Sequence, residues 1–210
     1  MRQPKALIAA AVCLSLLLLP LEPAVACSAY DEHINRAASR YGVPAWLIKG
    51  VIAAESGFRA DAYRPEPRVN DAAHGLMQVL LSTARDMGYR GSSAGLLDPA
   101  TNIDLGTRYL GMMMERFGGE HELAVAAYNA GPGLVGRLVN QYGRSYAAIR
   151  PHLERGARDH VTRVMNYAAQ FRAGQTPFAC PAGAAPRAER SGNALTWLFL
   201  LAIVWALTNQ

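Results

Sequence analysis

Apolar residues recur at helical spacing through the middle of the chain, and Gly or Pro residues separate the apolar stretches. No run of alternating Val, Ile or Thr residues is long enough to predict a strand. The segment 61–74 is rich in Pro, Arg and Asn and reads as a loop. The pattern therefore indicates an all-α domain, with predicted helices over residues 31–41, 44–55, 82–87, 98–117, 120–128 and 157–171.

The helix predicted over 44–55 carries a carboxyl group on its apolar stripe. Ile48, Val51 and Ile52 recur at i, i+3 and i+4, and Glu55 takes the next position of the same stripe. Burial penalises the charged form of a carboxyl group, and so favours the protonated acid that general-acid catalysis requires. Taken alone, this helix is more typical of a terminal glutamate turned into solvent, so other parts of the chain have to decide.

A first apolar block outside this domain lies at the N-terminus. Arg2 and Lys5 precede an apolar run over 6–19, and Ala24-Val25-Ala26 has the small-residue pattern of a signal-peptide cleavage site. We therefore predict a signal peptide over 1–26 and export to the periplasm. An uncleaved anchor fits less well, because a processing site is present.

Two cysteines remain after removal of this segment, and they flank the globular region. Cys27 and Cys180 would close a disulfide across the ends of a domain over 27–178 in an oxidising compartment. Cys27 directly follows the cut, so it is also a candidate for lipid modification. That alternative leaves Cys180 as an odd free thiol, which favours the disulfide.

A second apolar block follows a Pro-, Gly- and Ala-rich linker over 179–193. Residues 194–207 carry no charge, and Trp197 and Trp205 suit the two interfaces of a bilayer. The block is shorter than the roughly 20 residues that span a typical membrane. We predict that 194–210 is a membrane anchor, because the linker detaches it from the domain and no face of it is polar, unlike a core helix.

The charge balance suits an anionic partner. The 210-residue chain has a formal net charge of +5, which fits a membrane surface or an acidic cell-wall polymer. Its Arg residues are scattered and form no dense basic run, which argues against nucleic acid as a partner. The His residues show no metal-ligand spacing, so we predict neither a metal nor a cofactor.

Four short motifs occur in the order seen in the SLT-domain lytic transglycosylases. These goose-lysozyme-like enzymes cleave bacterial peptidoglycan, and the resemblance covers roughly residues 45–170. It implies a lysozyme-like, α-rich fold. The motifs are Glu55-Ser56, Gly75-Leu76-Met77-Gln78, Asn102-Ile103 with Gly106, and Ala127-Tyr128-Asn129-Ala130-Gly131-Pro132-Gly133.

The resemblance also implies the chemistry. Glu55 would act as the single acid and base, protonating the glycosidic oxygen between N-acetylmuramic acid and N-acetylglucosamine. It would then deprotonate the muramyl 6-hydroxyl, which attacks the anomeric carbon and forms a 1,6-anhydro end. Met77 would form the floor beside the acid. The residues that would line the cleft, and orient the N-acetyl group or bind Glu55, are Ser56, Gln78, Tyr128 and Asn129.

Two departures from the family bear on this expectation. The stretch between Glu55 and Gly75 is longer than usual, and Asp71 within it is a candidate second carboxylate. His160 stands where the family usually has a tyrosine. It either replaces the hydrogen bond of that tyrosine or is a partly exposed helix residue.

Three functions stay open at this point. A single carboxylate suffices when the substrate's N-acetyl oxygen stabilises the anomeric centre and an internal hydroxyl attacks, which favours a transglycosylase. A hydrolytic muramidase would need a second acid, such as Asp71, to position water. A catalytically weak wall-binding module of an envelope-spanning assembly is the third function, and the partner machinery is unknown.

Overall fold

The computed structural model describes residues 28–177. The predicted signal peptide, the Cys27 and Cys180 pair, the linker and the predicted anchor all lie outside these residues. Within residues 28–177, no helix combines the length and the apolar character needed to cross a membrane.

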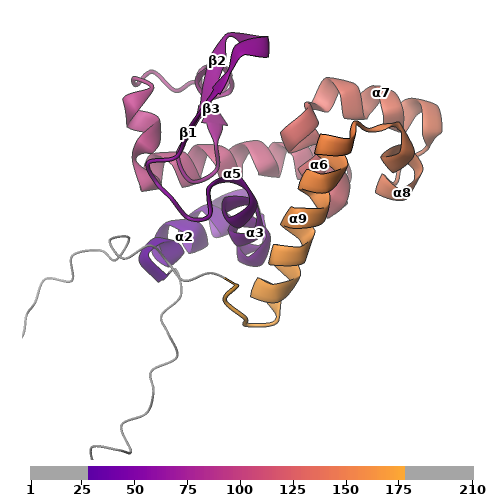
Figure 1. The fold of residues 1–210 in the computed structure, drawn as a ribbon. Coiled ribbons are helices and arrows are strands. Elements are labelled where there is room, and N and C mark those ends of the chain that lie inside the picture. Colours follow the sequence, from indigo (N-terminus) through magenta and orange to yellow (C-terminus); the bar gives the residue numbers. More distant parts are fainter. Residues whose placement is uncertain (1–27, 178–210) are drawn as a thin grey trace, which may run out of the picture.

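The described domain is rich in helix, as predicted (Figure 1). Its α-helices are α2 (Asp31–Tyr41), α3 (Ala45–Ser56), α4 (Leu81–Asp86), α5 (Pro99–Arg116), α6 (His121–Ala130), α7 (Pro132–Tyr142), α8 (Tyr146–Ile149) and α9 (Arg155–Arg172). Short 3-10 turns are η1 (Ser28–Tyr30), η2 (Pro67–Val69), η3 (Ala94–Leu97) and η4 (Arg150–His152).

The predicted loop over 61–74 is wrong, because this segment forms a β-hairpin. Strands β1 (Tyr63–Glu66) and β2 (Asp71–His74) pair antiparallel, and β2 also pairs with β3 (Val79–Leu80). The first three residues of β1 are exposed, so this strand has no buried face and no alternation of apolar and polar residues. The pattern that normally predicts a strand is therefore missing.

Helix α7 is the second element that the sequence pattern does not predict. The Gly131-Pro132-Gly133 turn reads as a break, but Pro132 takes the first helical position, where a missing N–H costs nothing. Val135 and Leu138 then bury one face of the new helix. The motif thus marks a change of helix direction between α6 and α7.

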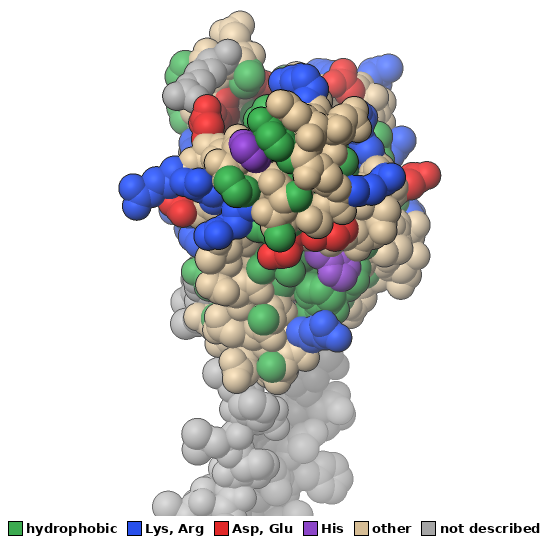
Figure 2. All heavy atoms as spheres, turned by 90° about the vertical axis from the view of Figure 1, so that its right-hand side faces the viewer, with side chains coloured by type: hydrophobic (Ala, Val, Ile, Leu, Met, Phe, Trp, Pro, Cys, Tyr) green, Lys and Arg blue, Asp and Glu red, His purple; other side chains and the backbone are tan. Residues whose placement is uncertain are grey.

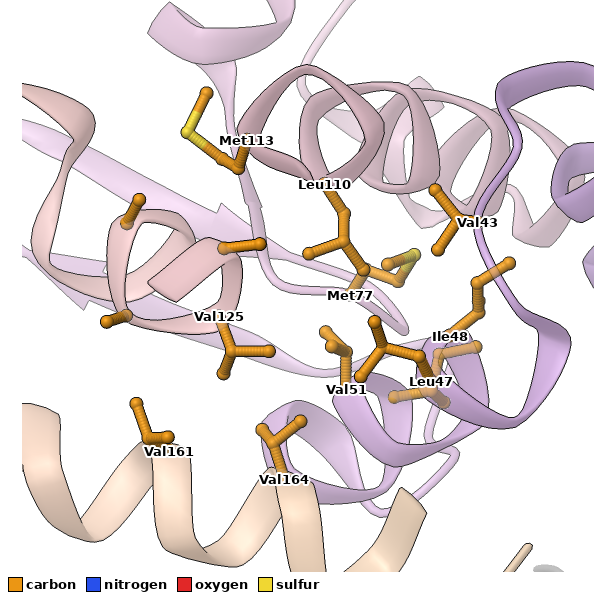
Figure 3. Close-up of a cluster of buried hydrophobic side chains, with 14 of the residues drawn as sticks. Val43, Leu47, Ile48, Val51, Met77, Leu110, Met113, Val125, Val161 and Val164 are labelled. Carbon is orange, nitrogen blue, oxygen red and sulfur yellow. The ribbon is translucent and has the colours of Figure 1, made fainter. Parts of the chain in front are cut away.

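The core joins helices from early and late parts of the described residues. Figure 3 shows Val51 of α3 and Val125 of α6 facing Val161 and Val164 of α9, and all four are almost fully buried. In Figure 1 the sheet stands on one side of these helices, and α7 and α8 stand on the other. The core thereby fixes α3, α6 and α9 between two peripheral parts of the domain.

Gly50 sets the distance between α3 and α9, which pack against each other more extensively than any other pair of described elements. A Cβ atom at Gly50 would lie 2.8 Å from Cβ of Ala168 and 2.9 Å from the carbonyl oxygen of Val164. Both atoms belong to α9, so a methyl group here would push the two helices apart. Only glycine permits the observed approach.

We expect Gly50→Ala to lower the free energy of unfolding by about 1–3 kcal/mol, the usual cost of overpacking a core. Urea denaturation measures it. The control is Gly136→Ala in α7, where the nearest atom is 3.6 Å away on the Arg116 side chain. That variant should be neutral or more stable by up to about 1 kcal/mol, because alanine favours helix. Equal destabilisation by both variants would contradict the packing argument.

Candidate active site

Glu55 lies in the last turn of α3, and its side chain is buried rather than turned into solvent. Ile48, Val51 and Ile52 on the same stripe are 0 % exposed, and the Glu55 side chain is 5 % exposed. Gly57 ends the helix with a left-handed backbone (φ 59°). The apolar stripe therefore carries a carboxyl group to the end of a buried helix.

His160 of α9 is the direct partner of this carboxyl group. Its Nε2 atom lies 2.9 Å from Oε1 of Glu55, and its side chain is 4 % exposed. The sequence left two alternatives for His160, a hydrogen bond at the site or a partly exposed position on the helix. The structure shows a hydrogen bond and a buried side chain. The close packing of α3 on α9 is what brings the two groups together.

A pocket opens beside Glu55, and we call it the Glu55 pocket. It is lined by Ala54, Glu55, Arg64, Asn129, Ala130, Leu134, Glu154, Gly156, Ala157, His160 and Arg163. A second pocket, the Gln78 pocket, is lined by Val69, Gln78, Val79, Leu80, Thr83, Tyr109, Tyr128, Asn129, Ala130 and Gly131. The two share Asn129 and Ala130 at the end of α6, so they adjoin there.

Tyr128 contributes a fixed hydrogen-bond donor to this region. Its Oη donates to the carbonyl oxygen of Met77 at 2.8 Å. Burial first, then the charge of Glu55 and the neighbouring Tyr109, raise the pKa of Tyr128 well above its ordinary value. The hydroxyl group therefore stays protonated and holds the 75–78 turn in place.

Two predicted cleft residues lie behind the cleft wall instead of lining it. The Ser56 hydroxyl donates to the carbonyl oxygens of Leu76, at 2.8 Å, and Ile52, at 3.2 Å, and it is buried. Met77 is 0 % exposed and lines neither pocket, although its carbonyl holds Tyr128. Ser56 thus ties the end of α3 to the 75–78 turn.

Gln78 lines the Gln78 pocket as expected, but its side chain also serves the turn. Its Nε2 donates to the carbonyl oxygens of Gly75, at 3.0 Å, and Ala62, at 3.2 Å. Its own backbone has a positive φ of 49°. These bonds leave the side-chain carbonyl of Gln78 as the group that can meet a ligand.

Asn102 holds the same turn from α5, a role that the sequence pattern does not predict. Its Oδ1 accepts from the Met77 amide at 2.8 Å, and its Nδ2 donates to the carbonyl oxygens of His74 and Leu96 at 2.7 Å each. The residue is 0 % exposed. The available signal was the place of Asn102 in the Asn102-Ile103 motif, on the buried face of α5.

Asp71 does not line the Glu55 pocket, where the hydrolytic alternative requires a second carboxyl group. It sits opposite Glu66 in the hairpin, lines neither pocket, and accepts from the Ala72 and Ser82 amides at 2.7 and 2.8 Å. Burial acts to raise the pKa of Asp71, but hydrogen bonds from Ser82, Ala72 and Leu81 outweigh it and lower the pKa. Its carboxylate is therefore occupied in stabilising the hairpin.

The hairpin contributes different residues to the cleft. Arg64 lines the Glu55 pocket, with its Nε 2.7 Å from Oε1 of Glu66, and Val69 lines the Gln78 pocket. Glu154 is the carboxyl group that joins Glu55 in its pocket, and it is exposed. Across the described part of the chain, no cluster of three His, Cys, Asp or Glu residues could hold a metal ion.

The basic residues are spread over the surface. On the face that carries the right-hand side of Figure 1, several Lys and Arg side chains gather at one edge around an acidic one, and others lie singly among acidic and apolar side chains (Figure 2). This face has no continuous basic stripe of the kind that follows a nucleic-acid backbone.

Comparison with known proteins gives one consistent family. A family model described as "Transglycosylase SLT domain" matches residues 32–149. The soluble lytic murein transglycosylase of Escherichia coli K12 is 35 % identical over 157 residues, which cover 69 % of this chain and 23 % of that protein. The membrane-bound lytic murein transglycosylase C of Haemophilus influenzae is 34 % identical over 123 residues, covering 52 % and 33 %.

Solved structures agree with the sequence relatives. The 70 kDa soluble lytic transglycosylase of Escherichia coli superposes with a TM-score of 0.60 at 31 % identity, covering 75 % of this chain and 26 % of that one. An inactive mutant of the lytic transglycosylase Slt from Pseudomonas aeruginosa gives 0.58 at 28 % identity, covering 76 % and 26 %. This chain therefore spans about a quarter of the length of these larger proteins.

Proposed function

Since the chain belongs to the transglycosylase SLT domain family, we propose that it is a lytic transglycosylase of peptidoglycan. It cleaves the β-1,4 bond between N-acetylmuramic acid and N-acetylglucosamine and leaves a 1,6-anhydro end. The observation that carries this proposal is the buried Glu55 carboxyl group at the wall of the cleft, hydrogen-bonded to His160.

In the first step, Glu55 acts as general acid. Its Oε1 is engaged with His160, which leaves Oε2 to carry the proton. That proton passes to the glycosidic oxygen as the bond to the anomeric carbon breaks, and N-acetylglucosamine leaves with a free 4-hydroxyl. The N-acetyl oxygen of the substrate stabilises the positive anomeric centre, as in substrate-assisted glycosidases.

In the second step, the Glu55 carboxylate acts as general base. It takes the proton of the muramyl 6-hydroxyl while that oxygen bonds to the anomeric carbon. The acid is thereby restored, and no water is consumed. An internal hydroxyl has a large effective-molarity advantage over water, which supports ring closure over hydrolysis.

The cleft residues support this assignment with different roles. Asn129 and Gln78 line the two pockets and are proposed to bind the sugar amides. Tyr128, Met77 and Ser56 are proposed to keep the wall beside Glu55 rigid, through the bonds described above.

We further propose that the catalytic domain is exported and held at the membrane. The sequence pattern supports this localisation, because it predicts a signal peptide over 1–26, a domain over 27–178, a linker over 179–193 and an anchor over 194–210. So does the name "membrane-bound" of the Haemophilus relative. Mass spectrometry of the mature protein without reducing agent tests the Cys27–Cys180 disulfide, and two free thiols or an acylated Cys27 would disprove it.

The reaction products test the proposed activity. Intact sacculi digested with the full-length protein should yield muropeptides with 1,6-anhydro ends, identified by mass spectrometry. Reducing muramic acid ends would instead show a hydrolytic muramidase, with water positioned by a carboxylate such as Glu154. Glu154→Gln distinguishes the two, because it should leave the anhydro product unchanged but would abolish reducing ends formed through Glu154.

A further inference from the structure

The bond between Glu55 and His160 joins a carboxyl group to an imidazole ring. The side chains are 5 % and 4 % exposed, so water has almost no access to the pair. A tyrosine, which the family usually has at this place, would offer a hydroxyl group that stays neutral over the working pH range. Histidine changes its charge between about pH 5 and 8 in ordinary surroundings.

The other ring nitrogen shows which form of His160 the site accommodates. Nδ1 is buried and has no hydrogen-bond partner among residues 28–177. A proton on Nδ1 would be a buried N–H donor without an acceptor, which proteins rarely tolerate. The arrangement therefore favours the neutral ring with its proton on Nε2, donated to Oε1 of Glu55.

We propose that Glu55 and His160 act together as one acid. In its active form Glu55 is protonated and the His160 ring is neutral. Neutral His160 is the positioning residue that donates through Nε2, and a second proton, bound at Nδ1, inactivates the site. This inference rests on the proposed function of Glu55. It goes beyond that function by giving this enzyme a loss of activity on acidification that a tyrosine would not cause.

The chemistry explains why the second proton inactivates the site. Bond cleavage builds positive charge on the anomeric carbon, directly beside the pair. An imidazolium there opposes that charge, and in a buried site the repulsion is weakly screened. At alkaline pH the site is inactive for a different reason: Glu55 has lost its proton and can no longer act as an acid.

The other charged or titratable groups that face the pair do not cause the same loss of activity at low pH. Arg64 from β1 and Arg163 from α9 stay charged throughout. Tyr128 from α6 stays protonated, because its pKa lies well above the ordinary value. Glu154, at the start of α9, is the other carboxyl group of the Glu55 pocket, so it needs a control.

The experiment compares kcat/KM for peptidoglycan across pH in the wild type, His160→Tyr and Glu154→Gln, all as full-length proteins. The wild type should give a bell-shaped profile that falls about tenfold per pH unit on the acid side. His160→Tyr should keep the alkaline arm and stay within about twofold of its maximum over the wild-type acid arm. Glu154→Gln should keep the fall of activity on the acid side, whatever its effect on the maximum.

An unchanged acid arm in His160→Tyr would overturn the proposal. If that variant does not fold, ¹⁵N NMR of the wild-type histidine rings decides. At the pH of maximum activity, His160 should be neutral with its proton on Nε2, and a proton on Nδ1 would refute the proposal. Absence of anhydro products from the wild type at every pH would instead disprove the proposed function itself.

Discussion

Replacing Glu55 with glutamine should reduce lytic activity about a thousandfold, within the usual contribution of a general acid of roughly 10²–10⁴. Glutamine has the same shape and can accept the hydrogen bond from His160, so the fold should persist. It cannot give a proton to the glycosidic oxygen or take one from the 6-hydroxyl. Release of soluble anhydro-muropeptides from sacculi measures the loss.

Glu115→Gln is the matched control for this variant, since it removes an exposed carboxyl group from α5 that lines neither cleft pocket. It should keep wild-type activity. Retained glycan binding by Glu55→Gln, without cleavage, would separate an enzyme from a wall-binding module. Full lytic activity in Glu55→Gln would show that Glu55 is not the acid.

Removing the Asn102 side chain should have the largest effect on stability. Asn102→Ala deletes all three side-chain bonds and removes this partner from the Met77 amide and from two carbonyl groups in the core. A buried group without a partner costs about 1–3 kcal/mol, so we expect a loss of about 3–5 kcal/mol in unfolding free energy. That is a large share of the 5–15 kcal/mol typical of a domain.

Urea denaturation compares this variant with Asn140→Ala, which truncates an exposed asparagine of α7 and should change stability by less than about 0.5 kcal/mol. Asn102→Asp adds a sharper test. It keeps the acceptor for Met77 but turns a carboxylate oxygen toward the His74 and Leu96 carbonyls. If either Asn102 variant is as stable as Asn140→Ala, the turn does not depend on this residue.

The sequence pattern predicts the elements that bury one clear face. Helices α2, α3, α5 and α9 lie close to their predicted ranges, and the stripe that ends in Glu55 is buried as its spacing indicates. In these segments the local periodicity and the tertiary packing favour the same structure. The helix by itself is more typical of a glutamate turned into solvent, so the prediction that Glu55 is a buried acid depends on the other motifs of the chain.

The remaining features depend on contacts that no local pattern encodes. Bonds from Asn102 to a turn some 25 residues away in the chain decide where Met77 lies. Glu154 joins the cleft only because α9 packs on α3, and Asp71 fails to join it because the hairpin uses its oxygens. The order of the motifs along the chain cannot show which side chains are already hydrogen-bonded within the protein.

The separation of 105 residues between Glu55 and His160 has a consequence for when activity arises. Contacts between distant residues close long loops, and they tend to form late in folding. Among the described helices, α3 carries the acid and the last one, α9, carries its partner, so a chain gains its complete site only when α9 docks. We therefore expect the proposed glycan-cutting activity to require docked α9, and chains that lack α9 should lack this activity.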